Sequence, residues 1–307
     1  MNTIAVLTPS YRPDFEGFAR LHRSVLEFTD DSVVHHVIVP RADREMFRTL
    51  KSSRLKIWIV DDLLPAGFVA TDAWAAHVRR VAFLPDRAAF SAVNLRRPWP
   101  PVRGWIMQQL MKLAVSTRLD ADAAVIIDSD VVILRRMTAD LFIRDDIVRF
   151  YSKPQAVTCG MDRHVQWTRA AHRLLGLPAP EGDAHPDHIA GITTWDPALV
   201  AACLQRVEEV AAAPWFRTIT SELHFSECIL YGTFVRHFAT ERQRSFTEPT
   251  TLCHSYWDPV PLTEARAGQF IADFGPTDIA VHIQSNSVTG EEVTRHVLDA
   301  LRAEARR

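Results

Sequence analysis

The stretch VIIDSDVVIL, from Val125 to Leu134, decides the fold class. Three apolar residues precede Asp128-Ser129-Asp130 and four follow, which is typical of a central strand buried in a parallel sheet. Burying two carboxylates costs free energy unless a cation neutralises them. Side chains two positions apart on a strand point to one face, so we expect both carboxylates to point the same way. The alternative is that the apolar run ends at Ile127 and the acids form a polar turn before a second strand.

The chain before this stretch alternates between two apolar patterns. Short apolar runs predict strands, and runs with apolar residues at helical spacing predict helices. This alternation favours an α/β fold with a mainly parallel sheet, whose carboxyl edge binds ligands in open sheets. The pattern weakens after about residue 150, so we expect a regular half over residues 1–150 and a second half over 151–307, packed as one domain. The expected strands are Thr3–Pro9, Val33–Pro40 and Leu55–Asp62, and the expected helices are Phe15–Phe28 and Gly104–Leu119.

Composition excludes several classes of protein. The 307 residues carry 35 Lys and Arg against 37 Asp and Glu, so there is no basic surplus for binding nucleic acid. The four cysteines are far apart in the sequence, which argues against a structural zinc site and fits a reducing compartment. We find no signal-peptide pattern and no apolar run of ~20 residues. We therefore expect a cytoplasmic protein without a transmembrane segment, compatible with peripheral association with a membrane.

The two acids predict a metal site. Carboxylate oxygens are ligands that Mg²⁺ and Mn²⁺ prefer, and phosphate oxygens of a substrate can fill the open positions. Asp128 and Asp130 would stand at the carboxyl edge of the sheet, where such a substrate binds. We therefore predict that Asp128 and Asp130 bind Mn²⁺ or Mg²⁺.

Several ordered motifs resemble one known group of proteins. They are GWIMQQLMKLA (Gly104–Ala114), VIIDSDVVIL, HIAGITTWD (His188–Asp196) and FSECILYG (Phe225–Gly232). Together they resemble GT-A fold glycosyltransferases, and most closely a little-characterised bacterial group of them. The resemblance covers most of the chain and implies a Rossmann-like mixed, mainly parallel sheet with flanking helices and a C-terminal acceptor-side portion. It departs from the group at Cys228, where an aromatic residue is expected.

The resemblance also implies a function. Residues 1–150 would bind a nucleotide-sugar donor, with UDP as the expected nucleotide, and residues 151–307 a carbohydrate or glycan acceptor. The reaction would be a metal-dependent glycosyl transfer in polysaccharide biosynthesis. One alternative is a nucleotidyltransferase acting on sugar phosphates, but the loop TPSYRPDF lacks the Gly-rich basic pattern of that class. Another is a non-catalytic nucleotide- or sugar-binding protein, and the retained acid pair argues against it.

The resemblance assigns roles to individual residues. Tyr11 would stack on the base and Arg12 would bind phosphate. Lys112, one helical turn from Gln109, would reach the diphosphate. The expected nucleotide-sugar-binding residues are Thr8, Pro9, Ser10, Tyr11, Arg12, Asp61, Asp62, Gln109, Lys112, Asp128 and Ser129.

The metal ligands and the catalytic base complete the expected site. The resemblance implies a C-terminal histidine as a third ligand beside Asp128 and Asp130, and His282 is preferred over His254. Asp130 is expected to contact the metal directly, whereas Asp128 holds either the metal, the ribose or a metal-bound water. Glu227 is expected to be the general base of an inverting transfer. A retaining transfer would not need this base, and the sequence leaves the stereochemistry open.

Overall fold

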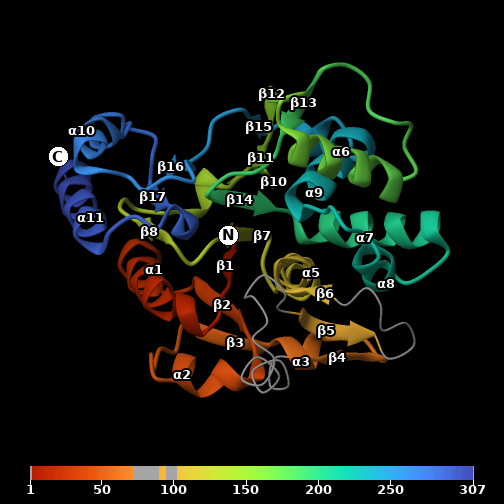
Figure 1. Cartoon of the computed structure of the whole chain (residues 1–307), viewed down its shortest axis with the longest axis horizontal. Helices are drawn as coiled ribbons and strands as arrows, with labels where there is room; N and C mark the ends of the chain where they lie inside the picture. The colour runs from red at the N-terminus through yellow and green to blue at the C-terminus, as the bar shows by residue number, and fades with distance from the viewer. Residues whose placement is uncertain (1, 72–89, 95–101, 307) are drawn as a thin grey trace.

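The computed structural model describes residues 2–71, 90–94 and 102–306, and its centre is a five-stranded sheet (Figure 1). The expected irregular segment between Leu64 and Pro101 lies largely outside these residues. The strand order is β14-β7-β1-β2-β3, in which β1, β2, β3 and β7 are parallel and β14 is antiparallel to β7. The prediction of a mixed, mainly parallel α/β fold is thus confirmed. The strands are β1 (Ile4–Pro9), β2 (Val34–Val39), β3 (Leu55–Ile59), β7 (Ala123–Ile127) and β14 (Ile192–Trp195).

Both faces of the sheet are covered, which explains the uninterrupted apolar runs of its strands. Ala5 and Leu7 of β1 belong to a core cluster shared with α5 (Gly104–Ser116), α7 (Pro197–Ala211) and α9 (Glu227–Phe238). Ile4 and Val6 point to the opposite face and join a second cluster with α1 (Phe15–Phe28). This alternation along β1 is that of a strand buried on both sides.

The stretch from Val125 to Leu134 forms two strands. The strand β7 ends at Ile127, and β8 (Val131–Ile133) joins a different sheet, of order β16-β17-β8, with β16 (Cys253–Tyr256) and β17 (Ala280–Ile283). The prediction of one strand carrying both acids on one face is therefore wrong, and the alternative of a polar turn is correct. The physical reason is the cost of burying charge, because the chain leaves the apolar sheet where the carboxylates begin.

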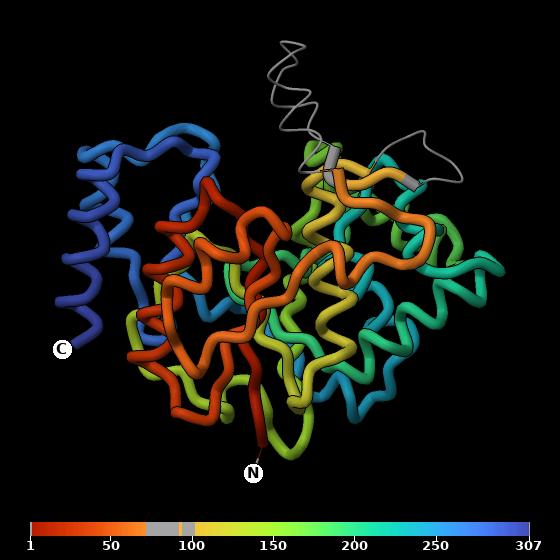
Figure 2. The backbone as a smooth tube through the Cα atoms, turned by 90° about the horizontal axis from the view of Figure 1, so that it is seen from below, coloured from red at the N-terminus to blue at the C-terminus, as the bar shows by residue number. Residues whose placement is uncertain are grey.

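The C-terminal segment returns to the start of the chain. The helices α10 (Glu264–Ala272) and α11 (Glu291–Ala305) pack on β8 and β17 through Val132, Val281 and Leu298. In two perpendicular views the blue C-terminal helices lie beside the red α1 (Figures 1 and 2). The turn Asp128-Ser129-Asp130 between β7 and β8 therefore lies where N-terminal and C-terminal segments meet.

The remaining elements frame this centre. The expected strand to Asp62 stops at Ile59 because the short helix α3 (Val60–Leu63) begins there, and the expected helix to Leu119 stops at Ser116. Among the described residues, no helix has both the length and the apolar character needed to cross a membrane. The other elements used below are α2 (Arg44–Arg48), α6 (Asp162–Leu174), α8 (Trp215–Thr220), β12 (Lys153–Thr158) and β13 (Ala184–Asp187); an antiparallel sheet is formed by β4 (Phe68–Ala70), β5 (Phe90–Asn94) and β6 (Val102–Arg103).

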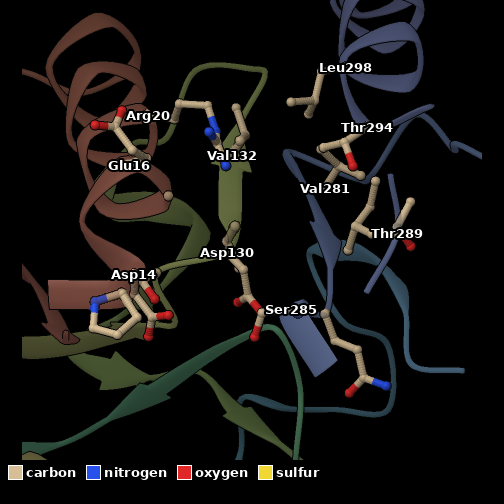
Figure 3. Close-up of a pocket in the computed structure, with 16 residues that line it drawn as sticks. Asp14, Glu16, Arg20, Asp130, Val132, Val281, Ser285, Thr289, Thr294 and Leu298 are labelled. Atoms are coloured by element: carbon tan, nitrogen blue, oxygen red, sulfur yellow. The ribbon is translucent and has the colours of Figure 1, made fainter. Parts of the chain in front are cut away.

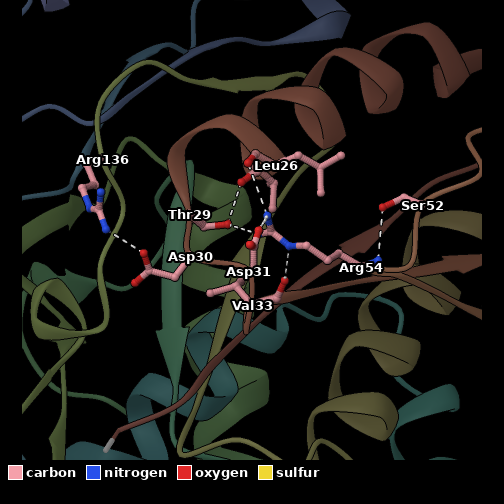
Figure 4. Close-up of polar contacts among 9 residues, drawn as sticks. Leu26, Thr29, Asp30, Asp31, Val33, Ser52, Arg54 and Arg136 are labelled. Carbon is pink, nitrogen blue, oxygen red and sulfur yellow. Dashed lines mark hydrogen bonds and ion pairs between the residues drawn. The ribbon is translucent and has the colours of Figure 1, made fainter.

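Arg54 ties the first helix to the sheet (Figure 4). Its Nε donates to the carbonyl of Val33 at 3.0 Å, and its Nη1 donates to the carbonyl of Leu26 at 3.3 Å. A further hydrogen bond reaches the hydroxyl of Thr29, at the end of α1. One buried guanidinium thus satisfies backbone groups at the end of α1 and at the start of β2.

Candidate active site

The acid turn, defined as Asp128-Ser129-Asp130, is held tightly against the first turn of α1. A Cβ atom at Gly17 would lie 2.9 Å from the carbonyl oxygen of Ser129, closer than such atoms approach in proteins. Only glycine at this position lets the helix and the turn approach so closely. The packing of α1 therefore helps to set the position of both acids.

A cavity of about 890 Å³ opens at the carboxyl ends of β1 and β7, beside the acid turn. It is large enough for a nucleotide-sugar-sized ligand. Eight of the predicted site residues line this pocket: Pro9, Gln109, Lys112, Asp128, Ser129, Asp130, Glu227 and His282. The fold thus brings together positions from five segments of the chain: β1, α5, the acid turn, α9 and β17.

Asp130 and His282 meet where the acid turn enters the sheet of β8 and β17, in which His282 is in register with Val131. The Nε2 of His282 lies 3.3 Å from Oδ1 of Asp130, and the backbone N–H of Ser285 donates to Oδ2 at 2.8 Å. Burial by itself would raise the pKa of Asp130, but His282 and the Ser285 N–H outweigh it and lower the pKa below its ordinary value. The His282 contact has the distance of an ion pair without the geometry of a hydrogen bond, so the buried Oδ1 has no hydrogen-bond partner among the described residues. An ionised carboxylate with an unsatisfied oxygen beside an imidazole fits a divalent cation.

The protein groups alone do not form a complete metal cage. Within residues 2–71, 90–94 and 102–306, no three His, Cys, Asp or Glu side chains are close enough together to hold a metal ion. The carboxylate of Asp128, 48% exposed, turns instead toward Lys112. The chemistry of the donor set therefore fits an ion that takes only part of its ligands from the protein, as Mg²⁺ does beside substrate phosphates.

Lys112 connects the acid turn to the second half of the chain. Its Nζ donates to Oδ1 of Asp128 at 3.1 Å and to Oε1 of Glu227 at 2.9 Å. Burial opposes the charge of Lys112, but the two carboxylates outweigh it and raise its pKa above the ordinary value. Lys112 is therefore a fixed cation beside the acid turn.

The backbone of Glu227 is fixed as well. Glu227 is the first residue of α9, and its N–H donates to Oε1 of Gln109 at 3.0 Å. Gln109 thereby satisfies one of the backbone donors left free at a helix start, and the Ser226 hydroxyl accepts from the N–H of Ile229. Cys228, at the position where an aromatic residue was expected, is buried in the same turn and also lines the pocket.

Asp14 is a third carboxylate that sequence reasoning missed. It precedes α1 and lines the pocket next to the acid turn. Burial raises the pKa of Asp14 to about 6, and the charges of Asp130 and Asp128 add to the shift. A lone acid in the loop TPSYRPDF gives no sequence signal, because only the fold places it against the other two.

A smaller cavity of about 250 Å³ adjoins the main pocket between α1 and α11 (Figure 3). It shares Asp14 and Asp130 with the pocket, and Arg20 points into it from α1. Its opposite wall carries Thr294 and Leu298 of α11. The acid turn thus contributes residues to the lining of both cavities.

Several predicted nucleotide-binding residues lie outside the pocket lining. Thr8 and Ser10 are buried, and the Thr8 hydroxyl lies 3.0 Å from Nε2 of His35. Arg12 pairs with Asp43 at 3.2 Å, while Tyr11 is 41% exposed. Their roles stay predictions.

Two further predictions fall on residues with other partners. Arg41 contacts both Asp61 and Asp62, and its Nε lies 3.3 Å from Asp61 Oδ1. These acids follow β3 in α3 and are absent from the pocket lining, so their role at the nucleotide base stays a prediction. His254, the second candidate ligand, is bonded through Nε2 to the carbonyl of Phe270 at 2.7 Å.

The fold and the pocket define an α/β protein with a mainly parallel sheet and an acidic site at its carboxyl edge. The chain belongs to DUF6492, described as a family of unknown function, whose model matches residues 3–292. No curated protein has a matching sequence.

Three solved structures are similar to this chain at 11–14% identity. The bifunctional glycosyltransferase WbbM is 13% identical, with a TM-score of 0.45 over 92% of this chain, which spans only 45% of WbbM. Mouse xyloside xylosyltransferase 1 is 14% identical, with a TM-score of 0.47 over 92% of this chain and 98% of that protein. The galactosyltransferase LgtC, solved with donor and acceptor sugar analogues, is 11% identical, with a TM-score of 0.45 over 97% of this chain and 95% of that protein.

Proposed function

We propose that the protein is a metal-dependent glycosyltransferase that moves a sugar from a nucleotide donor, with UDP as the expected nucleotide, to a carbohydrate or glycan acceptor. One observation carries the proposal: Asp128, Asp130, His282 and the buried cation Lys112 line one large pocket at the carboxyl edge of the sheet. Carboxylates beside a fixed cation suit a ligand that brings both a divalent metal and phosphate groups.

Asp130 and His282 are the proposed metal ligands, because the unsatisfied Oδ1 of Asp130 and Nε2 of His282 lie 3.3 Å apart in the pocket wall. Asp128 would add a ligand, or hold the ribose or a metal-bound water, from the other end of the turn. A bound Mn²⁺ or Mg²⁺ would neutralise charge on the diphosphate. Loop residues 8–12 and Asp61 and Asp62 stand at the ends of β1 and β3, where we place the nucleotide.

Lys112 is proposed to stabilise the leaving nucleoside diphosphate. Its position is set by Glu227 on one side and Asp128 on the other, so its charge needs no reorganisation when the glycosidic bond breaks. A preorganised cation of this kind lowers the barrier more than a mobile surface lysine does.

Glu227 is proposed as the general base that takes the proton from the acceptor hydroxyl in an inverting transfer. Lys112 occupies Oε1, whereas Oε2 has no hydrogen-bond partner among the described residues. Glu227 also lines the pocket, as a base must to come within reach of the acceptor. Oε1 therefore binds Lys112, and Oε2 is left to accept the proton of the acceptor hydroxyl.

Thermal unfolding with Mn²⁺ and nucleoside diphosphates tests the donor part of this proposal. We expect UDP with Mn²⁺ to raise the Tm, since a ligand at a hundred times its Kd adds about 2.7 kcal/mol to the stability. Asp130→Asn should abolish the shift, while Asp30→Asn, an exposed acid paired with Arg136, should keep it. If no nucleoside diphosphate stabilises the parent protein in the presence of Mn²⁺, the proposed donor site is wrong.

A further inference from the structure

Two exposed tryptophans line the main pocket. Of the six tryptophans in the described residues, Trp105 and Trp257 are the ones exposed to solvent, at 41% and 47%. Both belong to the pocket lining, although the pocket occupies a small part of the surface. Large exposed aromatic side chains in a concave site point to ligand contact.

The two tryptophans have different surroundings. Trp257 follows β16 and meets the ring of His282 edge-on at 4.5 Å, so it belongs to the proposed metal end of the pocket. Trp105 begins α5 and lies against α6, a helix of the second half of the chain. Trp105 therefore lies on the α6 side of the pocket, whereas Trp257 lies on the side of the proposed metal ligands.

The Trp105 indole packs against a second indole and a guanidinium. It stacks on the buried Trp167 with ring centroids 5.4 Å apart and an interplanar angle of 28°. The guanidinium of Arg163 lies 4.9 Å from the Trp105 ring centroid and 5.1 Å from that of Trp167. Stacking and cation–π contacts of this kind fix the orientation of the outer ring before a ligand arrives.

Polar groups stand next to this platform. The ring of His164 lies 4.7 Å from that of Trp167, and Asp187 at the end of β13 lies close enough to His164 for an electrostatic interaction. Both residues line the pocket. Asp187 accepts the N–H of Ile189 through Oδ1 at 3.0 Å, so its position is also fixed.

We propose that Trp105, backed by Trp167 and Arg163, is the stacking platform for a pyranose ring of the acceptor, with Asp187 and His164 binding its hydroxyl groups. A pyranose has an apolar face of C–H groups and a rim of hydroxyls, which matches an indole face beside a carboxylate and an imidazole. Calling the sugar an acceptor rests on the proposed transferase function. Binding of a pyranose at Trp105 does not, because it depends on the platform alone.

Saturation-transfer NMR on the full chain tests the proposal with simple probes. The probes are methyl β-D-galactopyranoside, methyl α-D-glucopyranoside and the methyl glycoside of N-acetyl-β-D-glucosamine, each without nucleotide, and UDP with Mg²⁺ in a separate arm. We expect at least one glycoside to bind the parent, with transfer strongest to the C–H groups of one ring face. Trp105→Ala should weaken its binding about tenfold or more, and Trp105→Phe less.

Phe238 offers a matched control. It is 39% exposed, stacks on Phe234 at 5.2 Å and has Arg206 5.2 Å from its ring centroid, but it lies outside the pocket lining. Phe238→Ala should leave glycoside binding unchanged. A circular dichroism spectrum of Trp105→Ala that matches the parent, together with an unaltered UDP–Mg²⁺ signal, would show that the variant is folded.

The outcomes separate the two proposals. Glycoside binding that is equal in the parent and in Trp105→Ala, or absent for all three glycosides in the parent, overturns the platform. Absence of a UDP–Mg²⁺ signal in a parent that binds a glycoside through Trp105 contradicts the transferase proposal and supports the platform.

Discussion

Lys112 and Glu227 are 115 positions apart in the sequence, yet Nζ of the lysine lies 2.9 Å from Oε1 of the glutamate. Both side chains are nearly buried, at 11% and 6% exposure. Lys112 also reaches Asp128 at 3.1 Å, so a single cation joins the acid turn to the start of α9. The pair fixes the relative position of the two halves of the site.

Removing the lysine should destabilise the protein because it leaves Glu227 buried without its partner. We expect Lys112→Met to lower the free energy of unfolding by about 3 kcal/mol or more, in the range for breaking a buried ion pair. The double variant Lys112→Met/Glu227→Gln should be more stable than Lys112→Met alone, since no buried charge is left over. Urea unfolding followed by circular dichroism measures both.

An exposed ion pair gives the control for this series. Arg136 and Asp30 pair with side chains 74% and 56% exposed (Figure 4), so Arg136→Gln should cost less than about 1 kcal/mol. A Lys112→Met variant no less stable than Arg136→Gln would show that the buried pair contributes nothing.

Gly17 is expected to control the position of the acid turn. Gly17→Ala would place a Cβ 2.9 Å from the Ser129 carbonyl, and relieving this overlap should cost about 1–3 kcal/mol and weaken Mn²⁺ binding. Gly268→Ala in α10 would meet no atom of the described residues within 4 Å, so it should stabilise the protein by about 0.5–1 kcal/mol through helix propensity. Urea unfolding measures the stability of both variants. A loss in Gly17→Ala together with a gain in Gly268→Ala confirms the expected close contact, and a change of the same sign in both contradicts it.

Buried histidines should make the fold acid-sensitive. Burial lowers the pKa of His22, His36 and His188 to about 4 and that of His35 well below its ordinary value. On acidification the unfolded chain binds protons at these histidines before the folded protein does. The stability that depends on the neutral histidines is therefore fully present above about pH 6.5 and is lost as the pH falls toward 4. The raised pKa values of Asp14 and Asp187 act with the opposite sign and offset part of the loss.

Urea unfolding at pH 7.5 and pH 5 measures this effect. Each buried histidine should contribute a loss of roughly 1–2 kcal/mol between these pH values. The substitution His296→Gln, at an exposed position of α11, should leave the difference unchanged. Stability that is flat or that increases on acidification would mean that these histidines are protonated in the folded protein.

Glu227 and Glu222 allow a comparison of two neighbouring acids. If Glu227 is the general base, Glu227→Gln should lower kcat for sugar transfer about 10²–10⁴-fold and change the KM of the donor little. Glu222 pairs with Arg173 and is absent from the pocket lining, so Glu222→Gln should keep nearly full activity. If transfer kinetics show the same loss of kcat in both variants, Glu227 is not the general base.

Local patterns in the sequence predicted the sheet well. Apolar runs gave β1, β2 and β7, because strands buried on both faces leave an uninterrupted signal. The same signal misled at the acid turn, where apolar residues on both sides hid the passage from one sheet to another. The pairing of Asp130 with His282 was anticipated only as shared metal ligation.

Contacts between distant segments were the part that the sequence did not reveal. Asp14 belongs to no motif, and Trp105 lies within GWIMQQLMKLA but was given no role; their place in the pocket depends on the packing of α1 and α6. The partners of Arg12 and Asp61 were also invisible, because an ion pair with Asp43 or Arg41 needs the folded geometry. Periodicity reports burial within one element, whereas a site is built from several.

The most direct test of the central claim is hydrolysis of nucleotide-sugars by the parent protein and by Asp130→Ala. A panel of UDP-, GDP- and dTDP-sugars with Mn²⁺ should identify a donor that the parent hydrolyses slowly to the nucleoside diphosphate. Asp130→Ala should lower this rate by about 10²-fold or more, since the proposed metal ligand is gone. Hydrolysis of the best donor at the parent rate by Asp130→Ala would contradict the metal assignment and the account built on it.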